Sequence, residues 1–229
     1  MVQSGIDRLF SMQTGHGGFA YWPGGSSPVV WGTAYATHVL LDAKKAGYPV
    51  DPQRLEHALD WLAQNSGMQN GRYYWQWGQA AYTHYVLALG GRGTKAAIKQ
   101  ALTGMELARF TRRPQGWDAE TRYLLQAALY LAGDRSYEKQ LRQPEIEAIT
   151  NERANDWTFY SDLRRWGIIL DTHAQLFGIH GSGEAIADHV ARALAGYNSR
   201  RFSTQELAWA VAGLGLSLIH ISEPTRLGA

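Results

Sequence analysis

Carboxylate side chains stand next to tryptophans at two places in the 229-residue chain. Asp118 and Glu120 follow Trp117, and Asp156 precedes Trp157. Paired carboxylates are the catalytic groups of most glycoside hydrolases, so a carbohydrate-active site is one hypothesis for these residues. Helix capping is the simpler one, because acidic side chains that precede an apolar helical pattern complement the exposed backbone amides. We expect capping here.

Two histidines occupy matching places in the sequence. His38 and His84 each follow a threonine and are 46 residues apart. Such a pair could bind a metal or act as a general base. Both lie on apolar helical faces, however, without a carboxylate or third ligand at a convincing spacing. We therefore predict hydrogen-bonded core histidines, no metal site and no cofactor. Four others are expected in loops or at the surface: His16, His57, His180 and His189.

Composition excludes several other kinds of chemistry. The chain contains no cysteine, which removes thiol nucleophiles, disulfides and cysteine-bound zinc within these residues. Lysine and arginine total 22 against 20 acidic residues, and no basic run is longer than two, so no nucleic-acid partner is expected. No signal peptide and no apolar run of about 18 residues is visible, so we expect no direct membrane insertion by this segment.

A repeated glycine pattern indicates how these residues are positioned. Five helix-like segments end at a small residue and a glycine, at intervals of 43, 43, 45 and 35 residues. Glycine is common just after the last helical turn, so the recurrence predicts equivalent helix ends and a repeating unit of two helices. The five glycines are Gly47, Gly90, Gly133, Gly178 and Gly213.

Each repeat is predicted to pair a more polar first helix with a more apolar, aromatic-rich second helix. Hairpins of this period must bury their apolar sides against one another, in an open solenoid or a closed ring. Glycine-aromatic loops favour the ring, so the predicted fold is all-α, an alpha/alpha toroid with one domain over residues 1–215. The first helices are expected over residues 6–13, 52–64, 95–110, 144–150 and 184–197.

Several motifs resemble the thioester domain of bacterial alpha-2-macroglobulins and occur in the same order. A glutamine, glycine and phenylalanine loop precedes a Trp-x-Thr-Ala-Tyr helix start, then a Ser-Asp-x-Arg helix start and a late Ser-Thr-Gln-Glu helix. The resemblance covers residues 3–215. The residues that carry it are expected to be structural: Gln13, Gly17, Gly18, Phe19, Trp31, Thr33, Tyr35, Ser161, Asp162, Arg164, Ser203, Thr204, Gln205 and Glu206.

The resemblance implies a six-hairpin toroid, with a terpenoid-cyclase-like fold, inside a large endopeptidase inhibitor that traps proteases. In that family the reactive Cys-x-Glu-Gln motif lies in the hairpin before the one that begins here at Gly5. About five of six hairpins and no thioester residue are therefore expected in this chain. Whether the parent protein has a thioester stays open, because the family also has a branch that lacks it.

The same resemblance implies partners, location and role. The partners would be target proteases and sibling domains of the parent protein, and the location would be periplasmic, at the cell envelope or extracellular. The domain would not be an enzyme, because a thioester is consumed in a single reaction.

Aromatic side chains near the hairpin mouths would keep water away from a thioester. The candidate shielding residues are Tyr73, Tyr74, Trp75 and Trp77. In complement relatives a histidine assists transfer to hydroxyl groups, but residues 69–78 contain none. The resemblance therefore favours amine targets, with His84 as a weak substitute.

Other polar groups have structural interpretations. Arg164–Arg165 and Arg200–Arg201 adjoin aromatic residues and could bind an anion or a partner domain, but solvated charge is expected. Ser203 and Glu206 have the spacing of a capping box, in which the two side chains satisfy helix-end amides. The nine tryptophans are expected mainly in the core.

An enzyme with a toroid fold is the alternative function. Terpenoid cyclases and prenyltransferases need a DxDD-type acidic motif or a zinc site, and neither is found in the sequence. A carbohydrate-active toroid would use Asp118, Glu120 and Asp156.

The end of the chain is unusual. Residues 216–226, LSLIHISEPTR, resemble a translated transposase-type sequencing adapter from a metagenomic shotgun library. We therefore expect residues 216–229 to be a sequencing artefact. A natural amphipathic end is the alternative.

Overall fold

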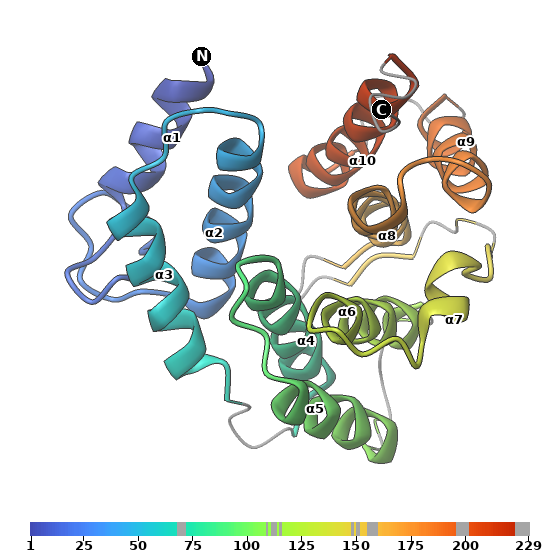
Figure 1. Ribbon diagram of the computed structural model, residues 1–229, viewed down its shortest axis with the longest axis horizontal. Helices are drawn as coiled ribbons and strands as arrows, with labels where there is room; N and C mark the ends of the chain where they lie inside the picture. Colours follow the sequence, from blue (N-terminus) through green and yellow to red (C-terminus); the bar gives the residue numbers. More distant parts are fainter. Residues whose placement is uncertain are drawn as a thin grey trace, which may run out of the picture. The chain divides into compact units, whose positions relative to one another are not determined.

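The computed structural model describes residues 1–67, 72–108, 110, 114, 116–147, 149, 152–154, 160–195 and 202–222. This part of the chain is helical, without a strand, and has two isolated bridges that join Gln13 to Phe19 and Arg153 to Ser161. The all-α prediction is therefore confirmed. The helices are α1 (Val2–Ser11), α2 (Val30–Lys45), α3 (Pro52–Asn65), α4 (Tyr74–Leu89), α5 (Lys95–Leu107), α6 (Trp117–Leu131), α7 (Glu138–Arg142), α8 (Asp162–Phe177), α9 (Ser182–Ala195) and α10 (Thr204–Ser222) (Figure 1).

The chain forms two compact units. Unit 1 comprises residues 1–109 and 128–134, and unit 2 comprises residues 110–127 and 135–229. Unit 1 thus contains α1 to α5 and the end of α6, and unit 2 contains most of α6 and all of α7 to α10. One domain over residues 1–215, with an artefact after it, stays a prediction.

The core of unit 1 lies between α2, α3 and α4, which pack on one another. α3 is amphipathic: Leu55, Leu59 and Leu62 are buried, whereas Glu56 and His57 on the opposite face are exposed. Each buried leucine stabilises the fold by about 1.5–3 kcal/mol relative to an exposed one. α4 is buried along its second half, so it contributes the more apolar helix of its pair, as predicted.

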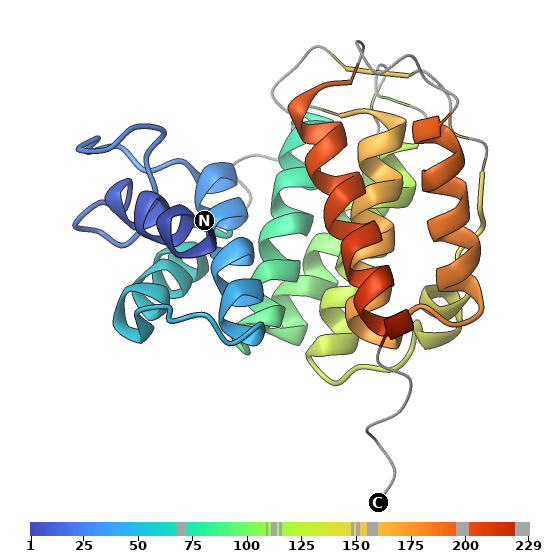
Figure 2. The ribbon, with the colours of Figure 1, turned by 90° about the horizontal axis from the view of Figure 1, so that it is seen from above.

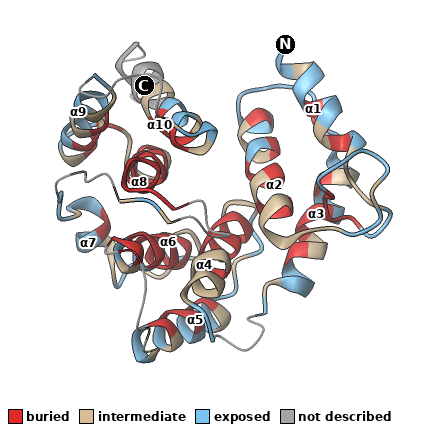
Figure 3. Ribbon diagram, turned by 180° about the vertical axis from the view of Figure 1, so that it is seen from behind, coloured by how far each residue is buried: buried red, intermediate tan, exposed pale blue. Residues whose placement is uncertain are grey.

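The core of unit 2 is built around α8. Every residue of this helix from Asp162 to Ala174 is buried, and both α9 and α10 pack against it (Figures 2 and 3). Glycine permits the close crossing of α8 and α10, because a Cβ atom at Gly167 would lie 2.7 Å from the carbonyl carbon of Trp209. Gly213 lies on α10 at the same crossing, where its Cβ would lie 3.0 Å from Gly167 O.

Gly213 does not end a helix, so that part of the glycine prediction was wrong. The sequence pattern could not separate a helix-ending glycine from one that permits close packing. The other four glycines mark helix ends as predicted, with one shift. Gly47, Gly133 and Gly178 adopt positive φ angles of 84°, 85° and 74°, whereas in the second repeat it is Gly91, next to Gly90, that has φ 73°.

One predicted helix was also misplaced. The first helix of the fourth pair is α7, at Glu138–Arg142, and residues 143–147, expected to begin a helix at 144, are not helical. Pro144 disfavours the helical conformation at Gln143, the residue before it, and α7 accordingly ends at Arg142 with Gln143 as its C-cap. The other four predicted first helices agree within a few residues. Among the described helices, none combines the length and apolar character that spanning a bilayer requires.

Candidate functional site

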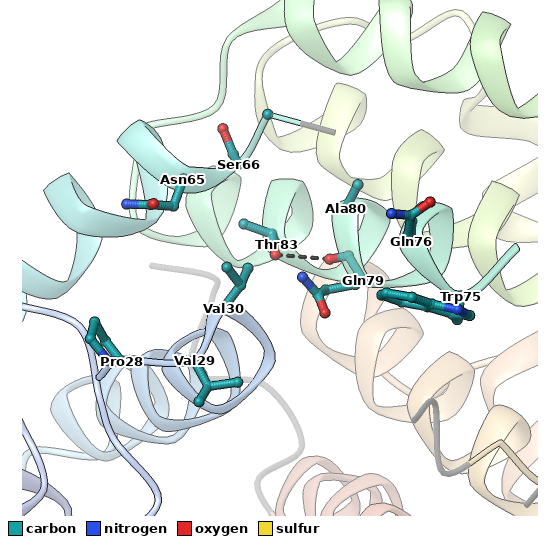
Figure 4. Close-up of a pocket in the computed structure, with 11 residues that line it drawn as sticks. Pro28, Val29, Val30, Asn65, Ser66, Trp75, Gln76, Gln79, Ala80 and Thr83 are labelled. Carbon is teal, nitrogen blue, oxygen red and sulfur yellow. Dashed lines mark hydrogen bonds between the residues drawn. The ribbon is translucent and has the colours of Figure 1, made fainter. Parts of the chain in front are cut away.

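A cavity of about 330 Å³ in unit 1 forms where three helix ends meet. We call it the aromatic pocket (Figure 4). One side is lined by residues at the start of α2, namely Pro28, Val29 and Val30. Asn65 and Ser66 lie at the end of α3, and Trp75, near the start of α4, lies apart from them. Eleven residues line it: Pro28, Val29, Val30, Asn65, Ser66, Gly67, Trp75, Gln76, Gln79, Ala80 and Thr83.

None of the lining residues carries a charge. The polar groups are amides and hydroxyls, and several are engaged locally. The Thr83 hydroxyl donates a hydrogen bond of 2.8 Å to the Gln79 carbonyl, and Gln76 Oε1 accepts one of 3.0 Å from the backbone N–H of Tyr73. The pocket can therefore hold a neutral group against an indole wall, but it offers no counter-ion to a charged one.

The four predicted shielding aromatics take different positions. Trp75 lines the pocket, and Tyr73 stacks on it with ring centroids 5.9 Å apart and planes 9° apart. Tyr73 is half exposed, and the Arg72 guanidinium lies 5.7 Å from its ring centroid. Trp77 instead packs over Gly104 of α5. Tyr74 is half-buried at the start of α4. Shielding by these residues stays a prediction, and Trp75 and Tyr73 are the two at the pocket.

The first motif forms a fixed loop between α1 and α2. Gln13 Nε2 donates to the carbonyls of Gly17 and Arg54, at 2.9 and 2.8 Å, and its Oε1 accepts from Arg54 Nε at 2.9 Å. The Phe19 N–H donates to Thr33 Oγ1 at 2.8 Å, which ties the loop to α2. Gly17 has φ 96°, a conformation that other residues rarely adopt.

Two further members of the motif group pack within unit 1. Side chains larger than hydrogen are excluded at Gly18, where a Cβ atom would lie 2.6 Å from both Pro28 and Trp61. Trp31 and Tyr35 stack with centroids 5.4 Å apart on α2. The residues of these first motifs therefore make local contacts that hold the loop against α2 and α3.

The two matching histidines are buried in unit 1, as predicted. His38 Nδ1 lies 3.0 Å from the Tyr82 hydroxyl, and its Nε2 lies 3.6 Å from Asp42 Oδ2. Burial lowers the pKa of His84, because the imidazolium form loses its hydration. His16, His57 and His180 are exposed, as expected, but His189 is half-buried with its ring 5.1 Å from that of Trp166.

A cluster of buried charges lies in unit 2 near the start of α8. Arg164 Nη1 is 3.0 Å from Glu120 Oε1, and both side chains are at most 10% exposed. Arg165 is 2% exposed, and its Nη1 lies 3.0 Å from Glu147 Oε2. The prediction that Arg164 and Arg165 carry solvated charge was therefore wrong. Glu120 and Glu147 come from α6 and from the segment before α8, and no sequence spacing indicates them, whereas Asp162, 3.0 Å from Arg165 Nε, lies three residues earlier on α8.

The start of α8 is capped as the sequence indicates. Ser161 Oγ accepts a hydrogen bond from the Arg164 N–H at 3.2 Å, and Asp162 lies in the first turn. Asp162 Oδ1 also accepts from the Tyr160 hydroxyl at 3.1 Å. Burial, with the neighbouring Asp162 carboxylate, raises the pKa of Tyr160 above its ordinary value. Ser161 and Asp162 thus have clear structural roles.

α10 begins with the predicted capping box. The Ser203 N–H donates to Glu206 Oε2 at 2.6 Å, and the Glu206 N–H donates to Ser203 Oγ at 3.3 Å. Arg153 adds a two-point contact to the Glu206 carboxylate, at 2.9 and 3.0 Å. Burial alone would raise the pKa of Glu206, but the hydrogen bonds from Arg153 and Ser203 bring it below its ordinary value. Thr204 is the first residue of α10, followed by Gln205.

The carboxylates proposed for glycoside hydrolysis are not brought together as a free pair. Asp118 and Glu120 lie in the first turn of α6, as capping predicts, but the Glu120 carboxylate also pairs with Arg164. Asp156 and Arg200–Arg201 lie outside the described residues.

One buried group was missed by the sequence reasoning. His173 Nδ1 lies 3.1 Å from the Tyr123 hydroxyl and 3.2 Å from the Leu141 carbonyl. Burial lowers the pKa of His173 despite its contact with Leu141. Its place on the apolar pattern of α8 is the signal that could have identified it.

Comparison with known proteins identifies the class to which this geometry belongs. Residues 1–103 match the family model described as the A-macroglobulin TED domain. The alpha-2-macroglobulin of Xylella fastidiosa is 33% identical over 119 residues, which is 50% of this chain and 6% of that protein. The chain thus spans only a small part of the curated relative's length.

Solved structures of similar fold extend the match along the chain. The trypsin-activated alpha-2-macroglobulin of Escherichia coli superposes with a TM-score of 0.68 and 21% identity over 93% of this chain and 14% of that one. Salmonella alpha-2-macroglobulin reacted with methylamine gives 0.67 and 20% over 97% and 14%. The E. coli segment from domain MG7 to the C-terminus gives 0.68 and 20% over 94% and 34%.

These matches define an alpha/alpha-toroid domain of the TED type, which confirms the predicted fold class. The chain resembles the TED domain of bacterial alpha-2-macroglobulins, by sequence over residues 1–103 and by fold over most of its length, as the sequence motifs indicated.

Proposed function

We propose that this chain is the helical domain of a bacterial protease trap, in which it presents or shields a thioester supplied by residues outside the chain. The observation that carries the proposal is the fold match over 93% of the chain to an alpha-2-macroglobulin that trypsin activates. Elastase activates the same E. coli protein, and methylamine reacts with the Salmonella one. Activation of one of these relatives by proteases and reaction of the other with a small amine support the proposal of an acyl group released by cleavage.

The proposed chemistry is acyl transfer to an amine. A neutral lysine amine of the attacking protease adds to the thioester carbonyl carbon, a C–N bond forms, the C–S bond breaks, and the leaving thiolate takes up the proton that the amine loses. The event happens once per molecule, so the protein acts as an inhibitor and has no turnover. This chain contains no cysteine and contributes only the surroundings of the reaction.

The aromatic pocket is the part of the chain that we assign to shielding. Water hydrolyses an exposed thioester, so the acyl group must lie in a site from which bulk water is excluded. Trp75, with Tyr73 stacked on it, and the two valines Val29 and Val30 supply apolar walls. Because the lining carries no charge, no side chain there attracts a hydrated counter-ion.

The complete parent protein tests the trap. The gene would be amplified and sequenced from the source DNA across both ends of this segment, and the encoded protein purified and mixed with trypsin. We expect the mixed trypsin to cleave a small chromogenic peptide but not casein. A denaturing gel should show trypsin covalently joined to the parent protein. Full cleavage of casein would contradict the trap. Casein protection without a conjugate would leave the trap but contradict covalent capture.

A tryptophan substitution in the parent tests the shield. We expect Trp75→Ala to increase the rate at which methylamine releases a free thiol, measured with a thiol-reactive dye, because the pocket loses its indole wall. Trp22→Ala is the matched control, since Trp22 is 76% exposed and does not line the pocket. Equal release rates in the two variants would assign shielding to another part of the molecule.

The remaining proposals follow from the resemblance to bacterial alpha-2-macroglobulins. Partners would be target proteases and sibling domains, and the location would be the periplasm, the cell envelope or the extracellular space. Residues 216–229 stay proposed as adapter-derived, and the same sequencing across the source locus tests this. An identical tail in the amplified gene would contradict it.

A further inference from the structure

A second cavity, of about 340 Å³, lies within unit 2 between α6, α7 and α8. We call it the arginine pocket. It lies beside the charged cluster at the start of α8, and residues of the segment 143–147, which follows α7, line one side of it. Its lining combines apolar, amide and charged side chains: Ala119, Arg122, Tyr123, Gln126, Gln140, Gln143, Pro144, Glu145, Glu147, Arg165, Trp166 and Ile169.

The Arg165 guanidinium is fixed in the wall of this pocket. It is 2% exposed and its Cζ lies 5.0 Å from the ring centroid of Trp166. A Cβ atom at Gly116 would lie 2.5 Å from the same Cζ, so a side chain at position 116 would collide with the guanidinium. Glycine at 116 therefore leaves room for the guanidinium, whose orientation is set by packing before any ligand arrives.

The carboxylate that pairs with Arg165 at the pocket is held weakly. Glu147 Oε2 lies 3.0 Å from Arg165 Nη1, but the Glu147 side chain is 60% exposed. It belongs to the non-helical segment between α7 and α8. A carboxylate this exposed keeps much of its hydration, so another carboxylate can replace Glu147 at little cost.

One buried donor of the lining residues, Trp166 Nε1–H, makes no hydrogen bond to any described residue, and Trp166 is 1% exposed. Arg165 Nε lies 3.0 Å from the buried Asp162 Oδ1, so these two side chains form an ion pair. Indole and guanidinium nitrogens only donate, so the ligand that suits this wall is an acceptor. A buried donor without an acceptor is unfavourable, so a ligand that accepts its hydrogen bond is favoured.

We propose that the arginine pocket binds a monocarboxylate with an apolar body, whose carboxylate replaces Glu147 at Arg165. The lining contains two arginines, Arg122 and Arg165, and two glutamates, Glu145 and Glu147. When Glu147 turns away from Arg165, one positive charge loses this partner, so a ligand with a single negative charge restores the balance. Trp166, Ile169 and Pro144 provide the apolar contacts for the body of the ligand. Its source is a small free acid or the C-terminal residue of a peptide.

Binding to the 229-residue chain tests the proposal by calorimetry. The probes are 4-phenylbutyrate, its uncharged amide, and the peptide acetyl-Ala-Ala-Phe with a free or an amidated C-terminus. We expect each acid to bind and each amide to fail. Tighter binding of the free peptide would assign the pocket to a peptide terminus, and tighter binding of 4-phenylbutyrate to a small acid. Equal binding of acid and amide, or no binding by any probe, would overturn the proposal.

A gain of affinity on removal of the Glu147 carboxylate would distinguish a ligand-binding site from an ion pair that has only a structural role. Glu147→Gln removes the internal competitor, so the affinity for 4-phenylbutyrate should rise about fivefold, the equivalent of a pair worth about 1 kcal/mol. Glu184→Gln is the control, because it removes the same charge from an exposed side chain outside the pocket. If both variants bind as the unmodified chain does, Glu147 does not occupy the ligand's place and the proposal fails.

Discussion

The two pockets of this chain differ in charge. The aromatic pocket of unit 1 has no charged lining residue, whereas the arginine pocket of unit 2 contains two arginines and two glutamates beside a buried ionic cluster. Both lie at helix ends, where backbone groups lose their helical partners. The polar contacts of the unit 1 pocket are made by amides and hydroxyls close in sequence, whereas those near the unit 2 pocket include ion pairs between distant segments. Unit 2 should therefore be more sensitive to the loss of a single side chain.

The largest effect is expected from breaking the buried pair of unit 2. Glu120→Gln leaves the Arg164 charge buried without a counter-ion, and the free energy of unfolding should fall by about 3–5 kcal/mol. Urea denaturation of the 229-residue chain measures it. Glu138→Gln is the control, since it breaks a more exposed pair with Arg142. Equal denaturation midpoints for the two variants would show that the buried pair is not critical.

A glycine pair tests packing in the two units. Gly167→Ala should destabilise the chain by about 1–3 kcal/mol, because the new methyl group meets the backbone of α10. Gly5→Ala in α1 should instead raise stability by up to about 1 kcal/mol, because nothing lies within 4 Å and alanine favours the helix. Thermal unfolding measures both. Stabilisation by Gly167→Ala would mean that α8 and α10 can separate without loss.

The capping box offers a smaller effect. Ser203→Ala removes one acceptor at the start of α10 and should lower the free energy of unfolding by about 1 kcal/mol. Ser203→Asp should restore most of it, because aspartate also caps. In unit 1, Val29 precedes α2 as its N-cap residue and makes no side-chain cap, so Val29→Ala should leave the helix end unaffected. Circular dichroism during urea denaturation distinguishes the three variants.

The smallest effect is expected in the pH dependence of stability. Burial lowers the pKa of His84 from 6.5, so below pH 6.5 the unfolded chain binds a proton that the folded chain does not. The free energy of unfolding should therefore fall as pH drops below 6.5, and this group has no effect above it. His84→Gln should reduce that slope, whereas His180→Gln, at an exposed position, should not. An unchanged slope in His84→Gln would contradict the expectation.

Glu206 in unit 2 responds at lower pH. Its pKa is below the ordinary 4.5, so the stability it contributes is present above 4.5 and is lost only as pH falls through the lowered value. Unfolding measured from pH 7 to pH 3 should thus show a His84-dependent loss first and a Glu206-dependent loss later. Glu206→Gln should abolish only the later one.

The sequence alone determined the features that depend on neighbours along the chain. Glycines at 47, 133 and 178 mark helix ends because a positive φ is a local requirement. The capping box at Ser203 and Glu206 spans three residues, so its pattern is visible without a structure. The motif order also indicated the alpha-2-macroglobulin family.

Only the tertiary structure decided what depends on segments distant in the sequence. Arg164 and Glu120 are 44 residues apart, so nothing in their spacing showed that the arginine was buried. Gly213 resembles a helix-ending glycine until α8 is seen to cross α10 beside it. The aromatic pocket needs residues 28–30, 65–67 and 75–83 together. Local patterns report hydrogen bonding within a few residues, whereas burial and charge pairing depend on which helix faces pack together.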